Sequence, residues 1–211
     1  MMRFIAVILL ALPVVAAGAE RDGTGTGAAG FGNAPEGQKL AMQTCAVCHG
    51  MDGNSPLSAN PSLAGQHPEY LFKQLIEFKS GARANPIMAG MVANLSEQDM
   101  RDLSAFYASQ DEKQGAAKNM DLVSTGQQLY RAGIANKGVA ACSACHSPDG
   151  AGIPPVYPRI AGQHAEYTAT QLRAFRSGNR NNDTNEMMQT VASRLSDDEI
   201  NALAEYISGL H

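Results

Sequence analysis

The chain has 211 residues, of which 44% are hydrophobic and 17% charged, and its net charge at pH 7 is −4. This acidic balance argues against nucleic-acid binding, which requires a basic face toward the phosphates. The length suits one large domain or two small ones.

The first 19 residues predict a secretory signal peptide. Arg3 supplies the positive start, residues 4–15 form an apolar run, and the small residues 17–19 suit a signal peptidase. The run falls short of the roughly 20 residues that a membrane-spanning helix needs. We therefore expect export, with an uncleaved N-terminal anchor as the alternative. Residues 20–34, rich in glycine and small side chains, predict a flexible leader.

The four cysteines form two tight pairs, each followed directly by a histidine. The two Cys-x-x-Cys-His motifs consist of Cys45, Cys48 and His49, and of Cys142, Cys145 and His146. In this motif the two thiols reach the two vinyl groups of one porphyrin, and the histidine falls under the iron as its proximal ligand. A zinc site would need further ligands, and a thioredoxin-like dithiol would need a βαβ context; neither pattern is evident. The motifs therefore predict two covalently bound haem c groups.

The second half of the chain repeats the first. Residues 45–50 match residues 142–147, and residues 61–67 match residues 158–164, both at an offset of 97. Further along the offset becomes 100. A repeat of this length indicates two homologous domains.

The repeat and the composition together predict where the domains begin and end. We expect an N-terminal domain over residues 35–109, a polar linker over 110–121 and a C-terminal domain over 122–211. The change of offset predicts an insertion in the polar stretch 179–185. The basic residues there and on the preceding helix, Arg180 among them, are expected on solvated turns.

Helices are the elements that the pattern predicts. Apolar residues recur at three- and four-residue spacings from Tyr70 until Gly81, and the matching segment ends at Gly178. Ser96 and Ser196 are each followed three residues later by an acidic residue, which resembles a capping box opening a further helix. With no convincing strand pattern, each domain is predicted to be all-α. A domain this small usually needs a staple, and a haem with its broad apolar faces would serve as one.

The sixth ligand of each iron is predicted by comparing methionines across the repeat. Met88 lies seven residues before Leu95, and Met188 lies seven residues before Leu195. They are the only methionines after the motifs that occupy equivalent positions. A methionine sulfur closes the iron and raises its potential, which suits electron transfer, whereas an open position would permit ligand chemistry.

Two further matched pairs leave alternatives open. His67 and His164 could ligate the irons in place of methionine, although we favour a contact with a propionate or with the domain interface near a helix N-terminus. Pro61 and Pro158 lie twelve residues after the proximal histidines. Their carbonyls could accept the ring N–H and orient the ligand, or they could be ordinary loop prolines. Arg159 could pair with a propionate.

The motifs resemble those of a known family. CAVCHG, PSLAGQH, IMAGM and LSEQD in the first half, and CSACH, YPRIAGQHAEY, MMQTVASRLS and EYISGLH in the second, are similar to the dihaem cytochrome c4 family over residues 35–211. The resemblance implies two tandem class I cytochrome c-type domains related by a pseudo-twofold axis, with propionates near the interface. It implies His49/Met88 and His146/Met188 as the axial pairs.

The resemblance also implies a periplasmic carrier of electrons. Family members receive electrons from the respiratory chain and deliver them to haem-copper terminal oxidases, and some associate loosely with the membrane. The leading hypothesis is thus an electron-transfer protein that docks transiently with its donor and oxidase, without a small-molecule substrate. The alternatives are a haem-bearing subunit of a larger periplasmic redox enzyme and, less favoured, a dihaem peroxidase. A peroxidase needs one openable iron, against which the two matched methionines argue.

Overall fold

The computed structural model describes residues 30–211, and within them the regular structure is helical. The predicted signal peptide (1–19) and the leader as far as residue 29 lie outside the described residues. Two isolated bridges, Ile134 with Val139 and Ile153 with Tyr157, are the extended pairings recorded in this part of the chain. The expected all-α fold class is confirmed. Between residues 30 and 211, no helix is both long enough and apolar enough to cross a membrane.

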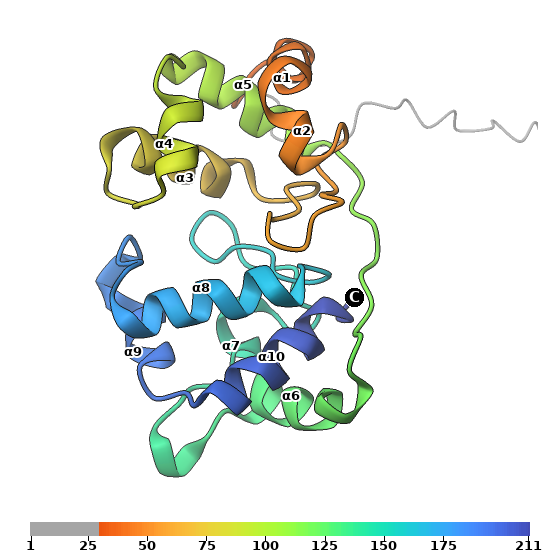
Figure 1. Ribbon diagram of the computed structural model, residues 1–211, viewed down its shortest axis with the longest axis vertical. Helices are drawn as coiled ribbons and strands as arrows, with labels where there is room; N and C mark the ends of the chain where they lie inside the picture. Colours follow the sequence, from red (N-terminus) through yellow and green to blue (C-terminus); the bar gives the residue numbers. More distant parts are fainter. Residues whose placement is uncertain (1–29) are drawn as a thin grey trace, which may run out of the picture.

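The helices form two halves stacked one above the other (Figure 1). The first half contains α1 (Ala34–Leu40), the π-helical turn η1 (Ala41–Cys45), α2 (Ala46–His49), α3 (Pro68–Ser80), α4 (Pro86–Val92) and α5 (Glu97–Ala108). The second contains α6 (Met120–Ala132), the turn η2 (Ala135–Lys137), α7 (Ser143–His146), α8 (Ala165–Ser177), the turn η3 (Thr184–Glu186), α9 (Met187–Ala192) and α10 (Asp197–Ser208). The α-helices of the two halves correspond one to one in chain order, as expected for a repeat.

The predicted helix ends are confirmed. Gly81 and Gly178 follow α3 and α8 in the left-handed conformation, with φ of +81° and +75°. Ser96 Oγ accepts the backbone N–H of Asp99 at 3.1 Å, and the Asp99 carboxylate accepts the N–H of Ser96 at 2.8 Å. The same reciprocal pair caps α10 from Ser196. These caps satisfy amide groups that would otherwise be unpaired at the helix start.

The first and last helices of each half pack together, α1 against α5 and α6 against α10. The periodicity did not predict α1 and α6. A Cβ on Gly37 of α1 would lie 1.9 Å from the carbonyl oxygen of Asp102, and a Cβ on Gly126 of α6 would lie 2.1 Å from that of Ala202. Each glycine therefore allows two helix backbones to touch. The buried cores lie around these contacts. Leu103 in the first half and Leu203 in the second are both 2% exposed.

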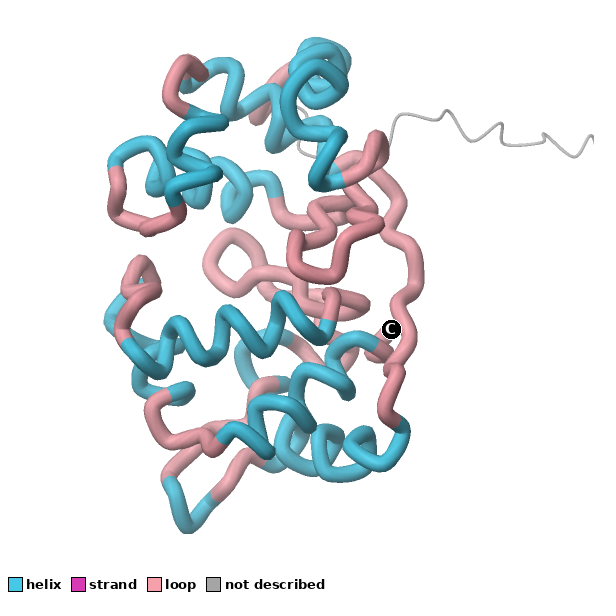
Figure 2. The backbone as a smooth tube through the Cα atoms, viewed as in Figure 1, coloured by secondary structure: helices cyan, strands magenta, loops and turns pink. Residues whose placement is uncertain are grey.

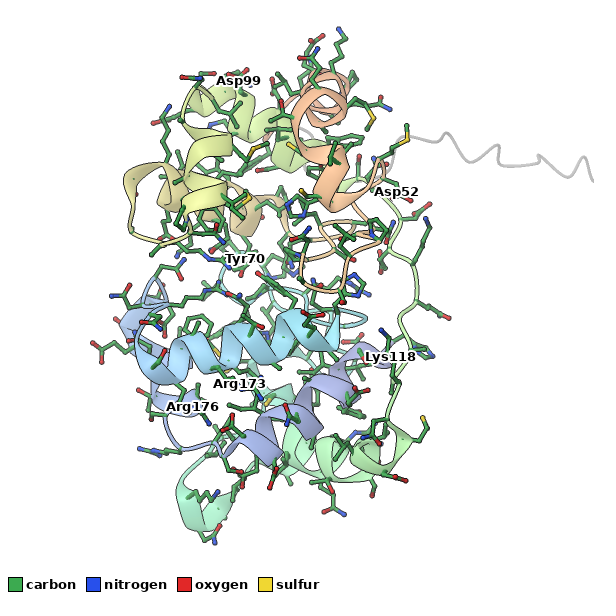
Figure 3. All side chains as sticks on the ribbon, in the orientation of Figure 1. Asp52, Tyr70, Asp99, Lys118, Arg173 and Arg176 are labelled. Atoms are coloured by element: carbon green, nitrogen blue, oxygen red, sulfur yellow. The ribbon has the colours of Figure 1, made fainter. Side chains whose placement is uncertain are left out.

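Segments between the helices, drawn as loops in Figure 2, fill much of the space between the two halves. The connection over residues 109–119 runs down one side (Figures 1 and 2), and α6 begins at Met120, inside the segment expected as linker. Across the interface, Arg83 donates to the Tyr167 hydroxyl and Arg180 to the Tyr70 hydroxyl, each at 3.0 Å. These pairs are related by the repeat offset, and Figure 3 shows Tyr70 between the halves. The contact is reciprocal, as a pseudo-twofold axis requires.

Candidate haem sites

Both Cys-x-x-Cys-His motifs lie on a single helical turn that ends at the histidine. In the first half η1 ends at Cys45 and α2 ends at His49, and in the second α7 ends at His146. None of the four cysteines is part of a disulfide. The histidines are 8% and 7% exposed. A helical turn brings residues three apart onto one face, which is the geometry needed for two thiols to meet one porphyrin edge.

One ring nitrogen of each histidine is held by a backbone carbonyl. His49 Nδ1 lies 2.9 Å from the carbonyl oxygen of Pro61, and His146 Nδ1 lies 2.9 Å from that of Pro158. Because a carbonyl can only accept, Nδ1 carries the proton and donates it, leaving Nε2 for a metal. Of the two interpretations of these prolines, the structure therefore supports the carbonyl that orients the ligand.

Burial sets the protonation of these groups. Burial lowers the pKa of His49 and of His146. The hydrogen bonds to the proline carbonyls oppose this effect and raise the pKa, but by less. The neutral ring is the form that binds a metal. Burial also raises the pKa of the Cys45 thiol, and raises that of Cys142 to about 11. Redox-active dithiols have a cysteine with a lowered pKa, which is opposite to the shift at Cys45 and Cys142. The donor set fits covalent haem with a neutral axial imidazole.

The two candidate methionines lie in the first turn of short helices. Met88 of α4 is half-buried and packs on the apolar cluster that includes Phe78, and its N–H donates to Asn85 Oδ1 at 3.0 Å. Met188 of α9 is half-buried against the core of the second half, and its N–H donates to Asp183 Oδ2 at 2.7 Å. A polar side chain thus anchors each methionine through its backbone, while the thioether chain itself can adapt.

The rival histidines precede α3 and α8 as their N-cap residues. His164 Nε2 lies 2.9 Å from the carbonyl oxygen of Ser55 in the other half, so this histidine contacts the domain interface. His67 Nε2 is buried without a hydrogen-bond partner among the described residues. The guanidinium group of Arg159, for which a propionate was considered, lies 3.0 Å from the Glu112 carboxylate in the connecting segment.

Arg180 was expected on a solvated turn, and the structure shows otherwise. It is 8% exposed, as is its repeat counterpart Arg83. Each guanidinium group stacks on a phenylalanine of its own half, with the Arg83 carbon 4.6 Å from the Phe78 ring centre and the Arg180 carbon 4.4 Å from that of Phe175. Apolar stems and cation–π contacts make such burial tolerable when the donors are satisfied. The matched position in the repeat was the signal that could have identified this pair.

Comparisons with known proteins agree with this description. The family model for cytochrome c matches the chain twice, over residues 34–111 and 123–211. Cytochrome c4 of Pseudomonas aeruginosa is 46% identical over 182 residues, which cover 85% of this chain and 90% of that protein. The crystal structure of reduced recombinant cytochrome c4 from Pseudomonas stutzeri has a TM-score of 0.82 at 43% identity, and the match covers 85% of this chain and 100% of that one.

A relative with a different description is also similar. The thiosulfate dehydrogenase electron acceptor of Stutzerimonas stutzeri strain A1501 is 38% identical over 188 residues, which cover 84% of this chain and 87% of that protein. Two helical domains, each with its own family match and Cys-x-x-Cys-His motif, define a dihaem c-type cytochrome. Two haem c groups are its cofactors, and electron transfer is its activity. The chain belongs to the cytochrome c4 family.

Proposed function

We propose that this cytochrome carries electrons in the periplasm, one at a time per haem, from the respiratory chain to a terminal oxidase. The observation that supports this most is the duplicated proximal arrangement, in which each buried histidine is fixed by a proline carbonyl at 2.9 Å. An iron whose ligands stay the same in both oxidation states reorganises little, which favours relay over substrate chemistry. The predicted signal peptide over residues 1–19 supports export.

The residues proposed for each haem come from one domain. For the first domain, 35–109, they are Cys45 and Cys48 as attachment sites with His49 and Met88 as axial ligands; for the second, 122–211, they are Cys142 and Cys145 with His146 and Met188. Residues 110–121 are proposed as the linker and 20–34 as the leader. The haem supplies the one-electron couple. The chain supplies a neutral imidazole held in one tautomer, a thioether that favours the ferrous state, and an apolar enclosure that excludes water.

A spectroscopic redox titration tests the ligands. We expect two one-electron waves at positive potential, and a methionine-to-iron charge-transfer band from both ferric haems. Met188→Ala should lower one potential sharply, remove part of the band and let that haem bind added ligands, because the iron loses its sixth ligand. Met88→Ala should do the same to the other haem.

Matched controls are available beside each candidate. Met187→Leu and Met91→Leu change methionines of the same two helices that have no methionine counterpart in the repeat, and they should leave the band unchanged. If Met188→Ala leaves both haems unaltered while His164→Ala disturbs one, the assignment of the ligands is wrong.

The partners are tested by kinetics. We expect a detergent-solubilised haem-copper oxidase to oxidise the reduced protein quickly, with a rate that falls as salt is added, since docking of charged surfaces is screened. The name of the electron-accepting relative supports a second donor, thiosulfate dehydrogenase. If thiosulfate dehydrogenase reduces the ferric protein when thiosulfate is added, the protein accepts electrons from that enzyme. Turnover of peroxide by the protein alone would contradict the carrier function.

A further inference from the structure

Two glutamines bind across the interface with both ends of their amide groups. Gln163 Nε2 donates to the carbonyl oxygen of Ser62 at 2.9 Å, and its Oε1 accepts the N–H of Ser62 at 3.0 Å. Gln66 makes the same two bonds to Arg159, at 2.8 and 2.9 Å. Ser62 and Arg159 are equivalent in the repeat, as are the glutamines, so the arrangement is reciprocal.

The position of each glutamine is fixed from its own side as well. Oε1 of Gln163 also accepts the N–H of His164 at 3.1 Å, and Oε1 of Gln66 accepts that of His67 at 3.0 Å. Each oxygen thus receives two backbone donors, one from each half, and only one orientation of the amide satisfies all the bonds. Gln66 is 8% exposed, so water competes little for these bonds.

The peptide group that each glutamine binds is the same one that holds a proximal histidine. The N–H of Ser62 and the carbonyl of Pro61 belong to a single planar amide. On one side this amide donates to Gln163 in the second domain; on the other it accepts from His49 in the first. Hydrogen bonds in such a chain polarise one another, so donation by the N–H makes the carbonyl a stronger acceptor. The equivalent path in the other half runs from Gln66 through the amide of Pro158 and Arg159 to His146.

We propose that each glutamine tunes the haem of the opposite domain, Gln163 acting on the first haem and Gln66 on the second. Both are positioning residues that act through the proline carbonyl, and the inference rests on the proposed axial role of His49 and His146. A stronger acceptor gives the imidazole more anionic character, which stabilises the ferric iron and lowers the potential. Loss of Gln163 therefore raises the potential of the first haem and leaves the second, although Gln163 belongs to the second domain.

The test compares the two glutamines in potentiometric titrations of the complete dihaem protein. Gln163→Met keeps the volume and removes the bonds, and should make the first haem easier to reduce by roughly threefold in its one-electron equilibrium constant, which is about 28 mV at about 59 mV per tenfold. Gln66→Met should shift the second haem in the same direction. Each wave is assigned in Met88→Ala and Met188→Ala backgrounds, where only one haem retains the charge-transfer band.

A second variant separates tuning from a general loosening of the interface. Gln163→Glu places a stronger acceptor against the N–H of Ser62 and should lower the potential of the first haem more than that of the second. Resonance Raman spectra of the ferrous protein in the Met88→Ala background should show the iron–histidine stretch falling in Gln163→Met, because the imidazole donates less strongly. Ser58→Ala removes another interface bond, to Glu166, and should shift neither haem.

Three outcomes would overturn the proposal. They are no shift in either glutamine variant, an equal shift of both haems, and a larger shift of the haem in the glutamine's own domain. If the methionine variants leave the charge-transfer band intact, the proposed sixth ligands fail, and the tuning path, which runs through His49 and His146, is judged by the potential shifts of the glutamine variants. If the methionine variants behave as expected and the glutamine variants do not, only the tuning path fails.

Discussion

The two halves of the molecule agree most closely where they hold a histidine and differ most where they present a methionine. His49 and His146 are hydrogen-bonded to proline carbonyls at the same distance, 2.9 Å. In both halves the residue after the proline is hydrogen-bonded through its backbone N–H to a glutamine of the other half. On the methionine side a neutral Asn85 anchors the first helix turn, whereas an anionic Asp183 anchors the second. Differences between the two haems are therefore expected to originate mainly on the methionine side.

A second difference lies at the interface. Lys73 donates to the carbonyl oxygen of Asn182 at 2.5 Å, and the Asn182 amide donates to Glu77 at 2.6 Å. In the other half the positions of Lys73 and Glu77 are occupied by Thr170 and Ala174, which cannot form the same bonds. The common part of the interface is thus symmetric, and this addition to it is one-sided.

The largest expected effect tests whether the two cores are equivalent. Leu103→Ala and Leu203→Ala each remove a side chain that is 2% exposed, and each should lower the free energy of unfolding of its own half by about 2–5 kcal/mol. Denaturant unfolding of the holoprotein, followed by circular dichroism, measures this. Leu57→Ala, at an exposed position, should change the free energy by less than about 0.5 kcal/mol. A cost near zero in either core would contradict the equivalence.

The next effect concerns the buried arginines. Arg83→Met removes the donor to the Tyr167 hydroxyl and one of the donors to the Gln74 amide oxygen. Arg180→Met removes the donor to the Tyr70 hydroxyl and one of the donors to the Gln171 amide oxygen, and each variant should cost about 1–3 kcal/mol. The Arg180 variant should cost more, because this side chain also donates to Asn182 at 3.0 Å. The same unfolding experiment compares them. Arg173→Met, which breaks an exposed pair with Asp197, should cost at most about 1 kcal/mol.

Exchanging the two anchors sharpens the comparison on the methionine side. Asp183→Asn removes a negative charge beside Met188 and should therefore raise the potential of the second haem. The change in the free energy of reduction should be on the order of 1 kcal/mol at the effective dielectric constant of a protein. Asn85→Asp adds a charge beside Met88 and should lower the potential of the first. Redox titration of both variants measures the shifts. Shifts of the same sign in the two variants would show that the anchors do not account for the difference.

The smallest effect is a dependence on pH. The hydrogen bond from Lys113 lowers the pKa of Asp52, labelled in Figure 3, to about 2 from its ordinary value of 3.8. Because the folded-state pKa is depressed, this stabilisation is present above about pH 4 and is lost as the pH falls toward 2. Solvent screening keeps it small. Unfolding curves measured between pH 2 and 5 should show that the free energy of unfolding falls less steeply with acid in Asp52→Asn than in the unaltered protein. An equal change in Asp149→Asn, the repeat counterpart, would contradict the role of Lys113.

The sequence predicted those features that depend on neighbouring residues or on the repeat. Helix ends at Gly81 and Gly178 follow from backbone conformations that glycine adopts easily, and the capping boxes of Ser96 and Ser196 follow from a three-residue spacing. Matching the two copies selected Met88 as a candidate by the same logic. All of these signals come from residues close together in the sequence or from positions that match between the two copies of the repeat.

Other features depend on partners far along the chain. Helices α1 and α6 were not predicted, although α6 has an apolar stripe at helical spacing, formed by Val123, Leu129 and Tyr130 around Gly126. What the local pattern does not show is that the backbones of α5 and α10 touch these two helices at Gly37 and Gly126. Arg180 has the local sequence of a solvated turn and is buried because Tyr70 and Gln74 reach it from the other domain. Local pattern contains no information about such distant groups, and a repeat indicates only that they come in pairs.

The reciprocal interface has the form by which two identical copies of one subunit associate, with a single surface patch meeting itself. Placing both copies in one chain keeps each patch at a high effective concentration near the other, so the contact need not be strong to persist. Covalent linkage also removes a constraint: in a homodimer any substitution occurs twice, whereas here one copy can change alone. The one-sided bonds of Lys73 and Asn182 are such a departure from symmetry. A fused pair can thus become a directional one, with two unequal ends for two different partners.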